Sequence, residues 1–213
     1  MDLSVSSVIL AGGLGKRLGG IDKGLIRHRD GTTLLYNLLD GMRHLASESL
    51  LVIRQEQSEQ FQSFVDMYAN EFPVRLIFDE GTGPAAALVL AAKFATHECI
   101  IVTGADHPHF DIELVTRLRK AWAEEQSNVI AAKRHSKKDN LKRDNVHPLW
   151  AIYRRSAVVN AALSTDWSHR SLSDLVEHLG PKRIECDSKA FMNINNPSDL
   201  DSFDCEIPNV DSH

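Results

Sequence analysis

The sequence predicts an α/β fold in which helices cover both faces of a mostly parallel sheet. Short apolar runs alternate with helical patterns over residues 6–132, and this alternation is typical of right-handed βαβ units. A glycine-rich loop follows the first apolar run, and charged residues lie at the ends of the next three. The length of 213 residues and the hydrophobic content of 43% fit one large domain of this class.

The spacing of apolar residues predicts the elements of this first part. Short continuous apolar runs indicate buried strands, whereas apolar residues three or four positions apart indicate helices. Thr33 is a candidate N-cap of the first helix. In chain order we expect a strand at 6–11, a helix at 34–45, a strand at 50–53, a helix at 57–69, a strand at 74–78, a helix at 85–95, a strand at 99–103, a helix at 112–125 and a strand at 128–132.

The regular alternation ends near Lys133, where a polar loop over residues 133–145 begins. Pro197 at the start of a helical pattern favours a final helix, because proline is tolerated in a first turn. We expect a strand at 148–153, helices at 158–163 and 172–179, short strands at 183–186 and 190–194, a helix from 196, and a disordered tail at 205–213.

Composition excludes several classes of function. A net charge of −5 argues against a protein that binds nucleic acid over a broad basic surface. Cys99, Cys186 and Cys205 are scattered, with no CxxC pair for a zinc or iron–sulfur site, so reduced thiols and a cytoplasmic location are expected. No targeting segment is visible, and no apolar run approaches the ~20 residues that span a bilayer.

The most informative stretch is the glycine-rich loop within residues 8–26. Five glycines lie between Gly12 and Gly20, with Lys16, Arg17 and Lys23 among and after them. Glycine permits close approach of a ligand to the main chain, and clustered N–H groups suit phosphate oxygens. The loop lacks the P-loop and dinucleotide-binding patterns. The loop therefore predicts a nucleoside triphosphate site. The alternative is a flexible turn that is present only for packing reasons.

Carboxylates at two further strand ends are candidates for the same site. Asp106 could hold Mg²⁺ beside a triphosphate, because magnesium takes one or two carboxylates plus phosphate oxygens. The alternative is that Asp106 caps residues 108–110. Asp79 could contact a base or ribose, or could simply form the turn before Gly81. Gly83 before the next helix offers free N–H groups and close backbone approach, with a plain helix start as the alternative. His107 and His109 are interpreted as ordinary loop residues, with a transition-metal site as the alternative.

Two more features carry alternatives. The basic residues within 133–143 are interpreted as a solvated loop, with a clamp for a second anionic substrate as the alternative. Asn193 and Asn195 would share one face of the expected strand at 190–194 and its end, near the nucleotide. They could join the metal or phosphate shell, or they could hold a turn through side-chain hydrogen bonds.

These motifs together resemble a known family. The run Leu10-Ala11-Gly12-Gly13-x-x-x-Arg17-Leu18-Gly19-Gly20-x-Asp22-Lys23 is similar to the signature of the MobA-like nucleotidyltransferases, the molybdenum cofactor guanylyltransferases. The resemblance continues through Asp79 with Gly83-Pro84, Asp106-x-Pro108, His147-Pro148 and Asn193-x-Asn195-x-Pro197, over about residues 6–203. The start Leu-Ala-Gly-Gly alone also occurs in sugar-phosphate nucleotidyltransferases.

The resemblance implies a Rossmann-like three-layer α/β/α sandwich of the nucleotide-diphospho-sugar transferase type. It implies one domain over 1–204, with a nucleotide-binding part at about 1–132 and an acceptor-binding part at about 133–204. The implied reaction transfers GMP from Mg²⁺-bound GTP to the phosphate of molybdopterin and releases pyrophosphate. A protein that delivers the cofactor is an implied partner, and neither nucleic acid nor membrane is expected.

The resemblance also assigns roles to residues of this chain. Arg17, Lys23 and Asp106 would be catalytic, with Asp106 as the Mg²⁺ ligand, and His147, Asn193 and Asn195 would lie near the acceptor or behind the site. The residues expected to contact the nucleotide are Leu10, Ala11, Gly12, Gly13, Gly15, Lys23, Asp79, Gly83 and Asp106.

The chain departs from the family at two places. Arg54 follows the second strand, where the family commonly has Asn, and Gly104-Ala105 precede Asp106 without the usual Cys. Related cytidylyltransferases tend to carry Ala-Ala-Gly where this chain has Ala-Gly-Gly, which favours guanine. The alternatives are a cytidylyl- or sugar-1-phosphate nucleotidyltransferase of the same fold, or a non-catalytic nucleotide-binding partner.

Overall fold

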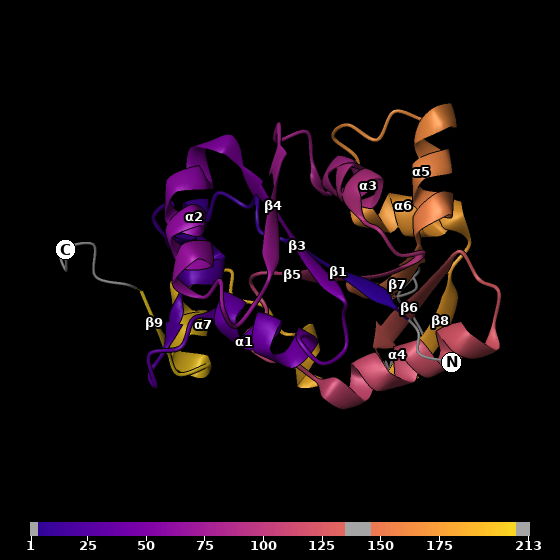
Figure 1. Ribbon diagram of the computed structural model, residues 1–213. Helices are drawn as coiled ribbons and strands as arrows, with labels where there is room; N and C mark the ends of the chain where they lie inside the picture. Colours follow the sequence, from indigo (N-terminus) through magenta and orange to yellow (C-terminus); the bar gives the residue numbers. More distant parts are fainter. Residues whose placement is uncertain (1–3, 135–145, 208–213) are drawn as a thin grey trace.

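The computed structural model describes residues 4–134 and 146–207. A seven-stranded sheet in the order β4-β3-β1-β5-β7-β6-β8 forms the middle layer, and helices lie on both faces (Figure 1). β7 runs antiparallel to β5 and β6, whereas the other neighbouring pairs in this sheet are parallel. The predicted three-layer α/β/α sandwich with a mostly parallel sheet is therefore confirmed.

The strands lie close to where apolar runs predicted them, usually with one or two residues added at an end. Their bounds are β1 Val5–Leu10, β3 Glu48–Arg54, β4 Val74–Asp79, β5 Cys99–Gly104, β6 Val129–Arg134, β7 Val146–Arg154 and β8 Lys182–Cys186. β6 thus continues into the predicted polar loop at 133–145, and the rest of that loop lies outside the described residues.

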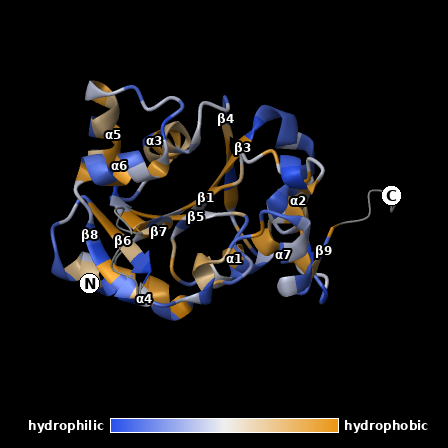
Figure 2. Cartoon of the chain, turned by 180° about the vertical axis from the view of Figure 1, so that it is seen from behind, coloured by the Kyte–Doolittle hydropathy of each residue, from blue (hydrophilic) through white to orange (hydrophobic). Residues whose placement is uncertain are grey.

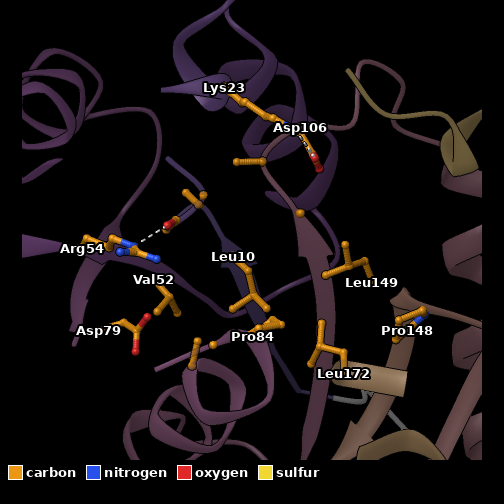
Figure 3. A pocket seen from close by; sticks show the side chains of 17 residues that line it. Leu10, Lys23, Val52, Arg54, Asp79, Pro84, Asp106, Pro148, Leu149 and Leu172 are labelled. Atoms are coloured by element: carbon orange, nitrogen blue, oxygen red, sulfur yellow. Dashed lines mark hydrogen bonds and ion pairs between the residues drawn. The ribbon is translucent and has the colours of Figure 1, made fainter. Parts of the chain in front are cut away.

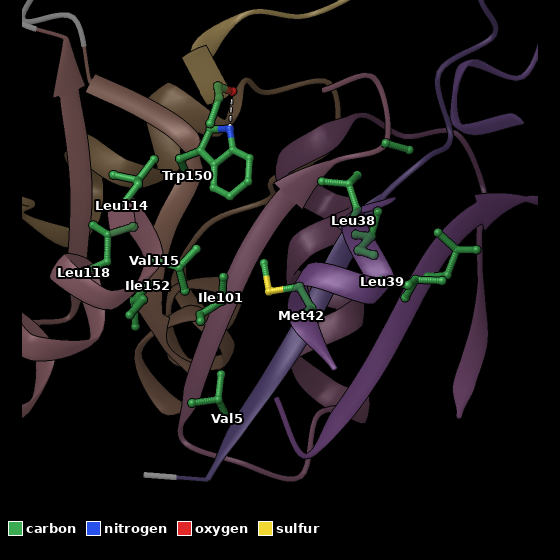
Figure 4. Close-up of a cluster of buried hydrophobic side chains, with 14 of the residues drawn as sticks. Val5, Leu38, Leu39, Met42, Ile101, Leu114, Val115, Leu118, Trp150 and Ile152 are labelled. Carbon is green, nitrogen blue, oxygen red and sulfur yellow. Dashed lines mark hydrogen bonds between the residues drawn. The ribbon is translucent and has the colours of Figure 1, made fainter. Parts of the chain in front are cut away.

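Two groups of helices bury opposite faces of the sheet. On one face lie α1 Leu34–Met42, α2 Ser58–Met67 and α4 Ile112–Glu124, and on the other lie α3 Pro84–Phe94, α5 Arg155–Ser164 and α6 Leu172–Leu179. Side chains alternate across each strand, so Ile9 packs in the first cluster and Val8 in the second. Figure 4 shows part of the first cluster, where Met42 of α1 faces Ile101 of β5.

Hydropathy follows this layering. The central strands are predominantly apolar, and the helices turn hydrophilic residues outward (Figure 2). Thr33 caps α1 as expected, since its hydroxyl accepts a hydrogen bond from the Tyr36 N–H at 3.0 Å. In the described part of the chain, no helix combines the length and the apolar run that crossing a bilayer requires. Cys99, Cys186 and Cys205 are free and buried.

Two expectations for the carboxyl-terminal region are wrong. Residues 190–194 form no strand: 190 and 191 belong to the short 3-10 turn η4 (Lys189–Phe191), and 192–194 follow it without pairing in a sheet. The tail at 205–213 is ordered at its start, since β9 Cys205–Glu206 pairs with β2 Arg27–His28. Residues 208–213 lie outside the described part. α7 Pro197–Ser202 forms where the proline predicted a helix.

Candidate active site

A cavity opens at the carboxyl ends of the parallel strands β1, β3, β4 and β5 (Figure 3). Its volume of ≈ 400 Å³ lies within the range of small-ligand sites. Parallel strands bring their carboxyl ends to one edge of a sheet, which is where ligands bind in open α/β folds. It is lined by Leu10, Ala11, Gly12, Gly13, Lys23, Val52, Arg54, Asp79, Gly83, Pro84, Ala87, Gly104, Ala105, Asp106, Pro148, Leu149 and Leu172.

The glycine loop turns sharply after β1, and Gly15 is the residue that permits the turn. Its φ of 53° lies in the left-handed region, and its carbonyl accepts hydrogen bonds from Leu18 N–H at 2.7 Å and Gly20 N–H at 3.1 Å. A Cβ at Gly15 would lie 2.0 Å from the Ile21 carbonyl oxygen. The loop therefore requires glycine at 15 for its own conformation, whereas Gly12 and Gly13 lie on the cavity wall.

Gln57 holds both ends of this loop against the end of β3. Gln57 is only 4% exposed. Its amide nitrogen donates to the Ala11 carbonyl at 3.2 Å and to the Asp22 carboxylate, and its amide oxygen accepts from the Arg54 N–H at 2.9 Å. Burial raises the pKa of Asp22, and the bond from Gln57 opposes that shift. One buried amide thus fixes the entrance and the exit of the loop.

Lys23 and Asp106 meet at one end of the cavity (Figure 3). The Lys23 Nζ lies 3.0 Å from Asp106 Oδ2 and 2.6 Å from Asn195 Oδ1. Both charged side chains are about one-fifth exposed, at 18% and 19%. The Ile194 N–H donates to the Asp106 carbonyl at 2.9 Å, so the carboxyl-terminal segment is fastened to the loop that carries this carboxylate. The ammonium group of Lys23 is thereby fixed beside the Asp106 carboxylate at this end of the cavity.

Two histidines form an aromatic cluster behind Asp106. His107 is buried against Trp150, its Nδ1 lies 2.9 Å from the Gly104 carbonyl oxygen, and burial lowers its pKa. His147 stacks on Phe191 with ring centroids 5.1 Å apart, and burial lowers its pKa to about 4. Both imidazoles are therefore neutral near pH 7, and they support the segment around Asp106 as packed aromatic groups.

The opposite end of the cavity carries Arg54 and Asp79. These residues are register partners at the ends of β3 and β4. The Arg54 Nε donates to the Gly12 carbonyl at 2.7 Å, as Figure 3 marks with a dashed line. Burial raises the pKa of Asp79, while the Gly81 N–H and the Arg54 charge act in the opposite direction. Leu10, Val52 and Pro84 add an apolar part to the cavity wall.

Most of the predicted nucleotide-binding residues line this one cavity. Some of the predicted site residues lie elsewhere. Arg17 is exposed on the short 3-10 turn η1 (Lys16–Leu18) and does not line the cavity, nor does Gly15. Asn195 reaches the site through Lys23, whereas Asn193 is exposed. The two amides share no strand face, because no strand forms there. Roles for Arg17, Gly15 and Asn193 in binding remain predictions.

Sequence reasoning missed Gln57 and the apolar wall formed by Leu149 and Leu172. Gln57 stood at the start of an expected helix, where a polar residue is ordinary. Leu149 lies on β7, which reaches the cavity because it pairs with β5 far earlier in the chain, and Leu172 lies on α6. Local spacing gave no signal for either feature.

The donor set around Asp106 fits Mg²⁺ better than a transition metal. The described residues contain no group of three or more His, Cys, Asp or Glu side chains that could enclose an ion. Magnesium usually needs only one or two carboxylates, and phosphates and water complete its ligands. Asp106, which is partly exposed beside the glycine loop, provides such a carboxylate. The amide oxygen of Asn195 accepts a hydrogen bond from Lys23, the same residue that pairs with Asp106.

The family model described as "MobA-like NTP transferase domain" matches residues 7–183. This chain belongs to the MobA-like NTP transferase family. Membership makes the chain a nucleotidyltransferase, in agreement with a cavity that joins a glycine loop to a lysine and a carboxylate. The predicted family is therefore confirmed.

Relatives of this MobA-like chain match it almost end to end. The molybdenum cofactor guanylyltransferase of Mannheimia succiniciproducens is 28% identical over 205 residues, covering 95% of this chain and 100% of the relative. The protein of the same name from Yersinia pseudotuberculosis serotype O:1b is 25% identical over 206 residues, covering 96% and 97%.

Solved structures share the fold. Molybdopterin-guanine dinucleotide biosynthesis protein A from Archaeoglobus fulgidus aligns with a TM-score of 0.69 and 21% identity over 93% of this chain and 96% of that one. A putative glucose-1-phosphate thymidylyltransferase from Bacillus anthracis aligns with a TM-score of 0.77 and 13% identity over 94% of each chain. At these identities the two likenesses show the fold alone.

Proposed function

We propose that this chain transfers GMP from Mg²⁺-bound GTP to the phosphate of molybdopterin, forming molybdopterin guanine dinucleotide and pyrophosphate. The observation that carries the proposal is the convergence of the glycine loop, Lys23 and Asp106 at one end of a cavity of ≈ 400 Å³. Relatives called molybdenum cofactor guanylyltransferase, which match nearly the whole chain, support the choice of reaction. A cytoplasmic location and a protein that delivers the acceptor remain predictions.

Catalysis of this reaction requires positioning of the substrates and neutralisation of their charge, and no covalent bond to the protein is needed. An oxygen of the acceptor phosphate attacks the α-phosphorus of GTP, the bond from that phosphorus to the bridging oxygen breaks, and pyrophosphate leaves with the electron pair. The attacking oxygen is already anionic, so no general base is needed. Preorganised donors aimed at the phosphates can then supply much of the rate enhancement.

The chain's own groups divide this work. Gly12 and Gly13 place backbone close to the phosphates, and Lys23 supplies positive charge beside them. Asp106 would hold Mg²⁺, which when bound neutralises charge on the phosphates. Because Lys23 and Asp106 mark the phosphate end, the base would lie toward Arg54 and Asp79. The acceptor would enter along residues of the 146–204 part, where Pro148 and Leu149 reach the cavity.

Pyrophosphate release tests the proposal directly. The protein is incubated with Mg²⁺ and GTP, CTP, ATP or UTP, with and without molybdopterin, and pyrophosphate is measured. We expect release with GTP and molybdopterin together. Release with CTP instead would favour a cytidylyltransferase, and release that requires a sugar 1-phosphate would favour that enzyme class. GTP binding without any release would indicate a non-catalytic nucleotide-binding partner.

An Asp106→Asn variant links the activity to this site. We expect it to lose at least about 100-fold in turnover while its unfolding transition stays near that of the wild type. Asp66→Asn is the matched control, because Asp66 is exposed on α2 and bonds Gln62 there. Near-normal GMP transfer by Asp106→Asn would contradict the proposed role.

A further inference from the structure

We propose that Arg54 is a specificity-determining residue that reads guanine, donating through its two terminal nitrogens to O6 and N7 of the base while Asp79 accepts from N1–H and the 2-amino group. The inference rests on the proposed function and assigns its base selection to two side chains. It starts from the position of both residues at the end of the cavity remote from Lys23.

The guanidinium of Arg54 is held in place with its outer edge free. Its Nε is committed to the Gly12 carbonyl at 2.7 Å, which fixes the direction of the fork. Among residues 4–134 and 146–207, neither Nη1 nor Nη2 has a hydrogen-bond partner or an ion pair. A Cβ on Gly81 would lie 2.9 Å from Nη1, so the absence of a side chain there leaves room for the guanidinium. Two parallel N–H donors are therefore available to a ligand.

Asp79 lies beside this fork because β3 and β4 place the two residues opposite each other. Neighbouring strands are about 5 Å apart. A Cβ on Gly12 would lie 3.6 Å from Arg54 Cγ and 3.8 Å from Asp79 Oδ2, so both side chains border the same part of the glycine loop. A pair of donors and a pair of acceptors are thus adjacent at one wall of the cavity.

Guanine presents the complementary pattern along adjoining edges. O6 and N7 are two acceptors that suit a bidentate arginine, and N1–H with the 2-amino group are two donors that suit a carboxylate. Adenine would turn its amino group toward the arginine donors and its N1 acceptor toward the carboxylate. Cytosine and uracil lack the N7 acceptor. Mismatched or unpaired polar groups in a partly buried site disfavour these bases.

Nucleotide analogues test each contact separately. We compare kcat/KM for GTP, 7-deaza-GTP, which lacks the N7 acceptor, and ITP, which lacks the 2-amino group. In the wild type each analogue should react about 10-fold or more slowly than GTP. In Arg54→Gln and in Arg54→Lys, which keeps the charge but loses the fork, the gap between GTP and 7-deaza-GTP should close while the ITP gap stays. Asp79→Asn should close the ITP gap alone.

Arg54 also holds the glycine loop through its bond to the Gly12 carbonyl. The ratio of kcat/KM for GTP to that for 7-deaza-GTP separates recognition of the base from this role. A looser glycine loop would slow GTP and 7-deaza-GTP alike, because the two share one triphosphate. Arg75→Gln is the matched control, since Arg75 is exposed on β4 and lies over Phe94. It should leave every ratio unchanged.

Equal use of GTP and 7-deaza-GTP by the wild type, or an unchanged 7-deaza gap in both Arg54 variants, would overturn the inference while leaving GMP transfer intact. Use of CTP in place of GTP would instead overturn the proposed function.

Discussion

The buried amide of Gln57 provides the sharpest test of how the glycine loop is held. In a Gln57→Leu variant, a side chain of similar size removes three hydrogen bonds at once. The Ala11 carbonyl and the Arg54 N–H lose their side-chain partner, and the Asp22 carboxylate loses its donor. Because Gln57 is 4% exposed, water cannot readily replace the amide without opening the structure.

The cost follows from the groups left behind. A buried backbone group without a partner costs about 1–3 kcal/mol, and Asp22 recovers some hydration because it is partly exposed. We therefore expect the free energy of unfolding to fall by roughly 2–5 kcal/mol, which corresponds to a Tm lower by roughly 5–15 °C in a chain of this size. The pKa of Asp22 should rise further, since the bond that opposes its upward shift is gone.

Urea unfolding followed by circular dichroism measures the free energy of unfolding. The KM for GTP reports whether the glycine loop keeps the conformation that binds the nucleotide. Gln62→Leu is the matched control on α2, the helix that begins directly after Gln57, because Gln62 is exposed and its side chain bonds only Asp66 in the described part of the chain. We expect the control to stay within about 0.5 kcal/mol of the wild type. If Gln57→Leu were equally mild and left the KM unchanged, the loop would not depend on this amide.

Three further predictions concern single features of the site. Gly15→Ala should lower the free energy of unfolding in urea by about 2–4 kcal/mol, because Gly15 has a φ of 53° and the new Cβ would lie 2.0 Å from the Ile21 carbonyl oxygen. Gly13→Ala is the control and should have a small effect, because a Cβ there would have nothing within 4 Å. Equal effects would contradict the loop geometry. Burial lowers the pKa of His147 to about 4, so the folded state binds fewer protons than the unfolded state, and about 3 kcal/mol of stability should disappear as pH falls from 6.5 to 4. His147→Phe should flatten this part of the pH–stability curve, and an unchanged slope would refute the assignment. Lys23→Met should reduce kcat for pyrophosphate release by about 100-fold or more with native circular dichroism, and a variant with normal kcat would exclude Lys23 from charge neutralisation.

Local patterns in the sequence predicted much of the fold. The alternation of apolar runs and helical patterns located β1, β3, β4 and β5 and the helices between them, because period and length distinguish such elements well. Residues 190–194 were mistaken for a strand. Their apolar side chains, among them Phe191 and Ile194, are buried by packing in clusters and not by pairing in a sheet. β9 was missed because a strand of two residues carries no periodic signal.

The residues of the candidate site also fall into those that local patterns predicted and those that depend on long-range contacts. Lys23, Asp79 and Asp106 were predicted because they follow motifs or strand ends, and the parallel sheet gathers strand ends at one edge. Gln57 and Leu149 were not predicted, since their roles arise from contacts between segments far apart in the chain. Asn195 was placed near the site for the wrong reason, because a hydrogen bond to Lys23 and not a strand face brings it there.

The central claim is that the glycine loop, Lys23 and Asp106 cradle the phosphates of a magnesium-bound nucleoside triphosphate. A crystal structure with Mg²⁺ and a GTP analogue whose α,β-bridging oxygen is replaced by a methylene group tests it most directly. The phosphates should lie against Gly12 and Gly13, with Mg²⁺ on Asp106 and the base beside Arg54. A nucleotide bound elsewhere, with this cavity holding only water, would contradict the account.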